Sequence, residues 1–268
     1  MKLSIVIFNY NYKRFLGQLF ISLEYAFNND NINIFFCDDG SSDDSLGFVN
    51  SYIHTNNINN LTIIEVSPIE LKRKYPSFGQ LEGIKKVIDS YNKELNDYIV
   101  FIDSDDWFGE NSIKNIYNEV NKTKCKIYFN DLRDAESYHK LPKEKQMIKR
   151  KVHQINTKIW PTIVPTSGIV INKQLLIDNL DKIINFDKKF SDVWLDSRIN
   201  MLALNFIEKV KYTDIVIYRL IHGSNDSLQF NLKRTIKKQL QASKYFNLIV
   251  NKKLKFNIRK KILEIIHG

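Results

Sequence analysis

Apolar runs of four to six residues alternate with stretches of helical periodicity over the first hundred residues of the chain. A strand buried on both faces reads as an unbroken apolar run, whereas a helix repeats its apolar positions every three to four residues. The runs predict strands at 3–8, 34–37, 61–66 and 98–102, and the periodic stretches predict helices at 13–27 and 78–91 and one that ends near 52. This alternation favours a parallel, doubly wound α/β sheet.

The pattern is looser after Trp107. There we predict helices at 110–120 and 192–204 and strands at 127–130, 167–171 and 215–218. The segment 133–152 is polar and rich in lysine, which is typical of a surface helix or a mobile loop. Residues 232–266 have the pattern of one or two basic amphipathic helices. We therefore expect one large domain over 1–228, followed by a basic helical extension over 229–268.

The charge of the chain is unevenly distributed. Its 268 residues include 40 Lys and Arg against 30 Asp and Glu, a formal net charge of +10, which attracts polyanions such as nucleic acid, anionic lipid and phosphorylated substrates. Between Lys233 and His267, eleven basic residues accompany one acid, Glu264. The acidic clusters lie at 38–44 and 103–106. A basic edge around an acidic centre suggests a metal site that recognises a phosphate.

Features that would direct the chain to a membrane or out of the cell are missing from the sequence. It has no run of about 18 apolar residues, the length needed to span a bilayer, and its amino terminus is too short and polar for a signal peptide. Cys37 and Cys125 have neither disulfide nor zinc spacing, so we expect reduced thiols. These features predict a cytoplasmic protein.

Polar residues follow three of the predicted strands directly. The strand at 98–102 ends in Asp103-Ser-Asp-Asp106, the strand at 34–37 in Asp38-Asp-Gly-Ser-Ser-Asp-Asp44, and the first strand in Asn9-Tyr-Asn-Tyr12. Ligands of open α/β sheets bind at the carboxyl ends of the strands. Packed carboxylates repel one another unless a divalent cation lies between them. A solvated helix N-cap is the alternative interpretation of the Asp103–Asp106 cluster.

Two common nucleotide-binding motifs are missing. No Gly-x-Gly-x-x-Gly follows the first strand, and no Gly-Lys-Ser/Thr occurs anywhere, so dinucleotide and P-loop chemistry are unsupported. Acids and a tyrosine ring at the strand ends instead suit a nucleoside, stacked on Tyr10, with a metal-bound diphosphate.

Three motifs in this order resemble the inverting family 2 glycosyltransferases of the GT-A fold. They are Ser4-Ile-Val-Ile-Phe-Asn-Tyr-Asn11, Cys37-Asp-Asp-Gly-Ser-Ser-Asp43 and Phe101-Ile-Asp-Ser-Asp-Asp106. Many members of the family build bacterial capsule, lipopolysaccharide or teichoic acid chains. The resemblance covers roughly residues 3–228 and implies a Rossmann-like, mostly parallel sheet flanked by helices. Phe8 stands where the family usually has Pro, while Tyr10 and Asn11 match it.

The resemblance also implies which residues bind the donor. Asp39 would hydrogen-bond the base, Asp103 would hold ribose or sugar, and Asp105 would contact a Mn²⁺ or Mg²⁺ ion. Gln80 stands where the family has an Arg that contacts phosphate or sugar, with 72–74 as candidates to replace that contact. The residues expected to line the nucleobase pocket are Phe8, Asn9 and Tyr10.

The family's catalytic base is an Asp in a Glu-Asp pair that opens a later helix. Two residues here are candidates. Asp196 has the better spacing to the helix end, whereas Asp192 has the better spacing to Arg198 and would cap the helix; we rank Asp196 first, although neither follows a Glu. Further on, Tyr218-Arg-Leu-Ile-His222 resembles the family's Tyr-Arg-x-His, which closes over the diphosphate. This implies that Arg219 binds the donor and that His222 is a metal ligand.

We therefore expect a metal-dependent, inverting glycosyltransferase that acts on a nucleotide-sugar donor and a glycan or lipid-linked acceptor in surface polysaccharide synthesis. UDP is favoured because a carboxylate such as Asp39 can accept the uracil N3–H, with GDP as the alternative. The basic C-terminal segment predicts peripheral association with the anionic inner face of the plasma membrane, and no nucleic acid partner is expected. The alternatives are a sugar nucleotidyltransferase, or a basic module that binds nucleic acid or a membrane surface and has a degenerate site.

Overall fold

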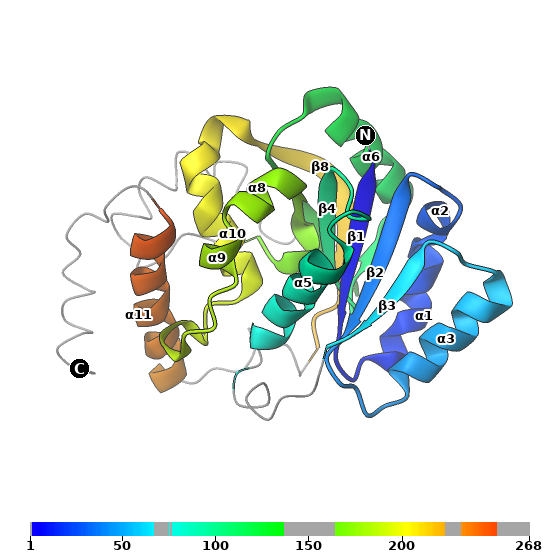
Figure 1. Cartoon of the computed structure of the whole chain (residues 1–268), viewed down its shortest axis with the longest axis horizontal. Coiled ribbons are helices and arrows are strands. Elements are labelled where there is room, and N and C mark those ends of the chain that lie inside the picture. Colours follow the sequence, from blue (N-terminus) through cyan, green and yellow to red (C-terminus); the bar gives the residue numbers. More distant parts are fainter. Residues whose placement is uncertain (1, 67–74, 76, 137–163, 223–231, 251–268) are drawn as a thin grey trace.

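The computed structural model describes residues 2–66, 75, 77–136, 164–222 and 232–250. Over this part of the chain an eight-stranded sheet forms the centre, with the strand order β3-β2-β1-β4-β7-β6-β8-β5 (Figure 1). Its strands are β1 (Leu3–Asn9), β2 (Ile32–Asp38), β3 (Leu61–Glu65), β4 (Tyr98–Asp103), β5 (Trp107–Phe108), β6 (Ile127–Asp134), β7 (Ile169–Asn172) and β8 (Val210–Arg219).

The sheet is mixed, with its parallel half at the amino-terminal side. β1 pairs parallel with both β2 and β4, and β2 pairs parallel with β3. β7 runs antiparallel between β4 and β6, and β8 returns parallel to β6. Because β7 reverses only one strand position, the carboxyl ends of β1, β2, β4, β6 and β8 lie at the same edge of the sheet. That edge is where the acidic motifs were expected.

Helices cover both faces of the sheet, and alternate residues of each strand point to opposite faces. Ile5 and Ile7 pack against one set of helices, whereas Val6 and Phe8 pack against the other. The first set is α1 (Lys13–Ser22), α2 (Glu24–Phe27), α3 (Ser45–Asn56) and α6 (Ser112–Thr123). The second set is α5 (Ser77–Tyr91), α8 (Lys173–Asp178), α9 (Leu180–Ile183), α10 (Leu195–Ala203) and α11 (Leu232–Ile249).

α11 is built into this second core. Ala242, Tyr245, Phe246 and Ile249 are at most 1% exposed and belong to the same hydrophobic cluster as α5 and α10. Figure 1 shows α11 at the end of the molecule far from α3, beside α9 and α10. No helix among the described residues is long and apolar enough to cross a membrane.

The predicted α/β class, sheet and flanking helices are confirmed, and the differences are local. The helix predicted at 13–27 is two helices that meet at Leu23, and the one predicted at 192–204 begins only at Leu195. β6 extends to Asp134, so the start of the segment predicted as surface helix or loop is strand; its part from 137 onward lies outside the described residues, as does 251–266. Gly40, in the turn after β2, adopts φ 74°, a left-handed conformation that favours glycine.

Candidate active site

Asn9 ties three strand ends together. Its side-chain amide donates to Asp38 Oδ1 at 2.7 Å and to Ser41 Oγ at 3.0 Å, and its Oδ1 accepts from Ser104 Oγ at 2.8 Å. Asp38 in turn accepts from the backbone and the hydroxyl of Ser41, which closes the turn after β2. Asn9, predicted to line a nucleobase pocket, is 3% exposed, and its side chain joins the ends of β1, β2 and β4 through these hydrogen bonds.

The other predicted nucleobase residues lie around this frame. Tyr10 is 49% exposed at the edge of the sheet, whereas Phe8 is buried and stacks on Phe101 with 5.9 Å between ring centroids. The half-buried Asp39 donates its backbone N–H to the Asn9 carbonyl. Its carboxylate lies so close to the first turn of α5 that a Cβ added to Gly79 would be 2.2 Å from Asp39 Oδ2.

The carboxylates after β4 form the acidic centre. Burial and the neighbouring Asp105 raise the pKa of Asp103 to about 8. The same two causes raise the pKa of Asp106 well above its usual value. Asp106 also has structural partners, because it accepts from Ser167 Oγ at 2.5 Å and from the backbone N–H of Leu220 at 3.0 Å. The cluster is therefore electrostatically strained, and a cation bound there would relieve it.

Asp105 pairs with the second predicted metal ligand. His222 Nε2 lies 2.8 Å from Asp105 Oδ2, and the imidazole packs edge-on to Tyr12 and beside Phe15. Across the described ranges, no group of three or more His, Cys, Asp or Glu side chains is placed to hold a metal ion. The carboxylate of Asp105 suits Mn²⁺ and Mg²⁺ alike, whereas the imidazole nitrogen of His222 suits a transition metal such as Mn²⁺ better than Mg²⁺, provided that substrate phosphates and water complete the coordination.

Gln80 and Arg219 border Asp103. The amide of Gln80 donates to Asp103 Oδ1 at 2.8 Å, and its buried Oε1 has no hydrogen-bond partner within the described part of the chain. The Arg219 guanidinium lowers the pKa values of Asp103, Asp106 and Asp196, so it acts on all three carboxylates. The basic residues at 72–74, expected to replace a missing Arg, lie outside the described residues.

The two candidate bases have different surroundings. Asp196, in the first turn of α10, interacts electrostatically with Asp103, and burial raises its own pKa above the usual value. Asp192 instead pairs with cations of α11, Lys237 Nζ at 3.0 Å and Arg234 Nε at 3.6 Å. The structure thus brings Asp196 into the acidic centre, while Asp192 contacts the carboxyl-terminal helix.

Sequence reasoning missed the residues that support the site from a distance. Ser167 donates to Asp106 and accepts from the backbone N–H of Asp103 at 3.0 Å, and Gln241 of α11 contacts Asp192. Neither residue lies in a motif of its own, so the sequence alone carried no signal for them.

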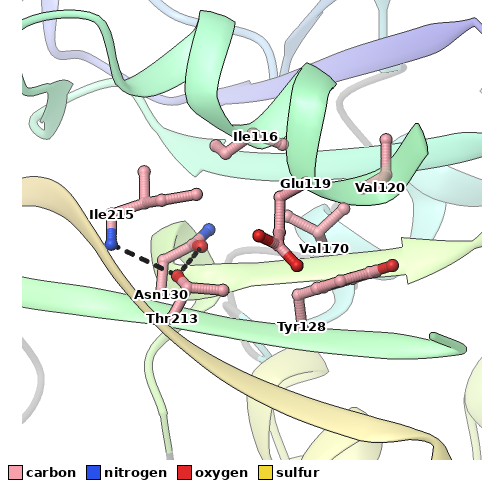
Figure 2. A pocket seen from close by; sticks show the side chains of 8 residues that line it. All are labelled: Ile116, Glu119, Val120, Tyr128, Asn130, Val170, Thr213 and Ile215. Carbon is pink, nitrogen blue, oxygen red and sulfur yellow. Dashed lines mark hydrogen bonds between the residues drawn. The ribbon is translucent and has the colours of Figure 1, made fainter. Parts of the chain in front are cut away.

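A small apolar pocket lies away from these acids, between α6 and strands β6 and β8 (Figure 2). Its side chains leave no room for a water molecule, and the only polar link drawn across it joins Thr213 to Asn130 and to the Ile215 backbone. None of the predicted site residues lines it. It is therefore a packing defect of the core and not a substrate site.

Comparison with known proteins gives consistent results. Residues 4–180 match the family model described as glycosyl transferase family 2. An uncharacterized glycosyltransferase of Nostoc sp. (strain PCC 7120) is 25% identical over 240 residues, which cover 85% of this chain and 67% of the relative.

Two solved structures share the fold. Residues 1–349 of S. aureus TarS, in complex with UDP, superpose with a TM-score of 0.62 at 14% identity, covering 98% of this chain and 69% of that chain. The mannosyltransferase PcManGT of Pyrobaculum calidifontis, in complex with GDP-Man and Mn²⁺, gives a TM-score of 0.61 at 12% identity, with 98% and 68% covered. Both neighbours support the GT-A fold.

Proposed function

The chain belongs to glycosyl transferase family 2, and on that premise we propose that it transfers a sugar, with inversion, from a nucleoside diphosphate donor to a hydroxyl of a glycan or lipid-linked acceptor. The observation that carries this proposal is the convergence of residues from distant parts of the chain on one edge of the sheet. Asp103 ends β4 and Asp105 follows it, Arg219 ends β8 and His222 follows it, and Asp196 lies in the first turn of α10. Family membership sets aside the nucleotidyltransferase and the simple binding module as alternatives.

Asp105 and His222 are the residues that would hold a divalent cation. When bound, such an ion neutralises the charge that develops on the departing diphosphate. The carboxyls of Asp103 and Asp106 support this assignment, because burial and then the charge of Asp105 raise their pKa values, and a bound cation would favour their ionised forms. The neighbour PcManGT was solved with Mn²⁺, which is consistent with it.

Asp196 is proposed as the general base. A base must remove the proton of the acceptor hydroxyl while that oxygen attacks the anomeric carbon, and a pKa raised by burial makes a carboxylate a better proton acceptor. The hydrogen bonds from Ser197, and then the charges of Arg219 and Lys238, oppose the effect of burial on this pKa. Asp192 is the second candidate, and its two ion pairs with α11 count against it.

Asp39 and Tyr10 are proposed to select the nucleotide. The carboxylate of Asp39 would accept the N3–H of uracil, and the half-exposed ring of Tyr10 would stack on the base. The fold neighbours were solved with UDP, UDP-GlcNAc and GDP-Man, so the preference for UDP rests on Asp39 and not on them. A role in surface polysaccharide synthesis, at the cytoplasmic face of the plasma membrane, remains part of the same proposal.

A donor panel tests the proposal. The protein is incubated with UDP-glucose, UDP-GlcNAc or GDP-mannose, with Mn²⁺ or with EDTA, and release of the nucleoside diphosphate is measured. We expect turnover with a UDP-sugar that needs the cation and is lost in the Asp196→Asn variant. Turnover in EDTA would remove the metal from the mechanism, a preference for GDP-mannose would overturn the nucleotide assignment, and no turnover with any donor would contradict the activity.

A further inference from the structure

The segment that leads into α10 has no cap of its own. Trp194 is the N-cap residue of the helix, and its side chain makes no capping hydrogen bond. A helix start without a cap depends on tertiary contacts for its position. The orientation of Asp196, in the first turn, therefore depends on whatever holds residues 190–193.

Gln241 of α11 holds this segment through a reciprocal pair of hydrogen bonds. Its Oε1 accepts the backbone N–H of Asp192 at 2.7 Å, and its Nε2 donates to Asp192 Oδ2 at 3.3 Å and to Ser191 Oγ at 3.4 Å. Gln241 is 6% exposed, so these contacts are made away from bulk water, where an unpaired amide would be costly.

Tyr245, one helical turn further along α11, supports the same segment through Arg198. The guanidinium of Arg198 is fully buried and lies 5.0 Å from the centre of the Tyr245 ring. It donates hydrogen bonds to four backbone carbonyls between the end of α9 and the start of α10, those of Ile183, Asn185, Phe190 and Val193. Gln241 and Tyr245 thus lie on one face of α11 and hold the two ends of the segment.

The Asp192 carboxylate also forms ion pairs with α11. Lys237 and Arg234, both on α11, face it at 3.0 Å and 3.6 Å, and its side chain is 13% exposed. A partly buried carboxylate with two cations and an amide around it is held in place by them, which suits a structural anchor better than a mobile proton acceptor.

We propose that Gln241 and Asp192 form a latch between α11 and residues 190–193, and that this latch makes Gln241 a positioning residue for Asp196. The inference rests on the proposed function, in which Asp196 is the general base. Gln241 does not reach the acidic centre itself; it acts through the backbone of the segment that begins α10.

Replacement of Gln241 by Leu tests the latch. Misplacing a base affects the transition state more than the ground state, so we expect Gln241→Leu to lower kcat about tenfold while the KM for the nucleotide-sugar stays within about twofold. Asn247→Leu is the matched control, an amide lost from the exposed side of the same helix, and we expect wild-type kinetics. Equal kcat in both variants, or a change in donor KM alone, would overturn the proposal.

An exchange of the two side chains separates the latch from the rival assignment. In Asp192→Asn with Gln241→Glu the carboxylate and the amide trade places, so the reciprocal pair can form again. We expect each single variant to lose activity and the double variant to recover at least half of the wild-type kcat. A double variant no more active than the less active single variant would overturn the latch. If Asp192→Asn and the double variant both turned over no donor while Gln241→Glu stayed active, Asp192 would be the base.

Amide hydrogen exchange distinguishes failure of the latch from failure of the proposed function. The Asp192 N–H is protected by Gln241 Oε1 in the structure. We expect Gln241→Leu, and not Asn247→Leu, to speed exchange across residues 190–196, whether or not a donor is turned over. Unchanged exchange refutes the latch even if the enzyme is active, whereas faster exchange in a protein that turns over no donor refutes only the proposed function.

Discussion

At the scale of single residues, Asp105 has an electrostatic cost in the folded state and a proposed role as a metal ligand. It raises the pKa values of both Asp103 and Asp106, so in the absence of a cation its charge destabilises the folded state. Sites that must bind a charged ligand often carry such strain in the free protein.

Asp105→Asn is therefore expected to have opposite effects on activity and stability. The substitution should abolish turnover, because it removes the proposed metal ligand, and should raise the free energy of unfolding of the metal-free protein by roughly 0.5–2 kcal/mol. Urea unfolding in EDTA and donor turnover in Mn²⁺ measure the two effects. Asp44→Asn, at a carboxylate 68% exposed, is the control and should change stability by less than about 0.5 kcal/mol. A loss of stability in Asp105→Asn would contradict the strained cluster.

The pH dependence of stability follows from Asp103. The folded chain keeps this proton up to about pH 8, whereas the unperturbed pKa is 3.8, so the folded state binds more protons between these values. The free energy of unfolding should then fall as the pH rises from 5 to 8 and level off above that. Asp106 and Asp196, whose pKa values are also raised, act in the same direction.

Thermal unfolding in EDTA at several pH values measures this slope. The groups with lowered pKa values, such as Asp43 and Glu119, affect stability only at more acidic pH and do not interfere. We expect Asp103→Asn to flatten the slope and Mn²⁺ with UDP to stabilise the protein more at pH 8 than at pH 5. A Tm that rises from pH 5 to pH 8 would show that these carboxylates are ionised without penalty.

At the scale of elements, the start of α5 constrains the proposed nucleotide pocket. Gly79 leaves the space in which the Asp39 carboxylate lies, 2.2 Å from where a Cβ would be. Gly17 in α1 has no atom within 4 Å of the same position. Both glycines lie within helices, so a substitution at Gly17 is a control for the same substitution at Gly79.

Gly79→Ala should displace Asp39, and we expect it to weaken UDP binding about tenfold in calorimetry. Gly17→Ala should leave binding unchanged and stabilise the protein by about 0.5–1 kcal/mol, since Ala costs less chain entropy than Gly in a helix. Unchanged UDP affinity in Gly79→Ala would argue against Asp39 as a base contact.

The strands could be predicted because burial on both faces leaves unbroken apolar runs, as in β1 and β4. The break between α1 and α2 could not, because Leu23 is itself apolar and buried and no Gly or Pro marks the bend. Two-residue β5 and four-residue α9 are too short for a periodic signal. The sequence pattern therefore predicted the long buried strands, but not the bend at Leu23 or the shortest elements.

The candidate site also contains residues that the sequence could predict and contacts that it could not. Asp103 and Asp105 directly follow a recognisable strand, so their place at the sheet edge could be expected. Spacing ranked Asp196 ahead of Asp192, but it could not show the surroundings of Asp192. The cations and the amide of α11 that contact Asp192 lie more than forty residues further along the chain. Asn9 was predicted to line the nucleobase pocket. In the structure its side chain forms hydrogen bonds to Asp38 and Ser104 and so connects the ends of neighbouring strands.

At the scale of the whole molecule, the structure makes α11 part of the main core, whereas the sequence suggested an extension that begins at 229. The prediction that tests this is Phe246→Ala, at a side chain 1% exposed in that core. We expect a loss of about 3–5 kcal/mol in a single cooperative urea transition. Leu248→Ala, at a residue 43% exposed on the same helix, should cost far less. A separate early transition for α11 in Phe246→Ala would support the predicted extension that begins at 229.

The position of β8 in the sheet has a consequence for the order in which the molecule is made. Asp105 meets His222 117 residues later, and Asp106 meets Leu220 114 residues later. At about 5–20 residues per second, a ribosome takes on the order of ten seconds to synthesise that interval. During this time β1, β2 and β4 can already pair, while Asp105 still lacks His222 and Asp106 still lacks Leu220. The chain therefore acquires its complete acidic centre only after β8 has joined the sheet, among the last steps of folding.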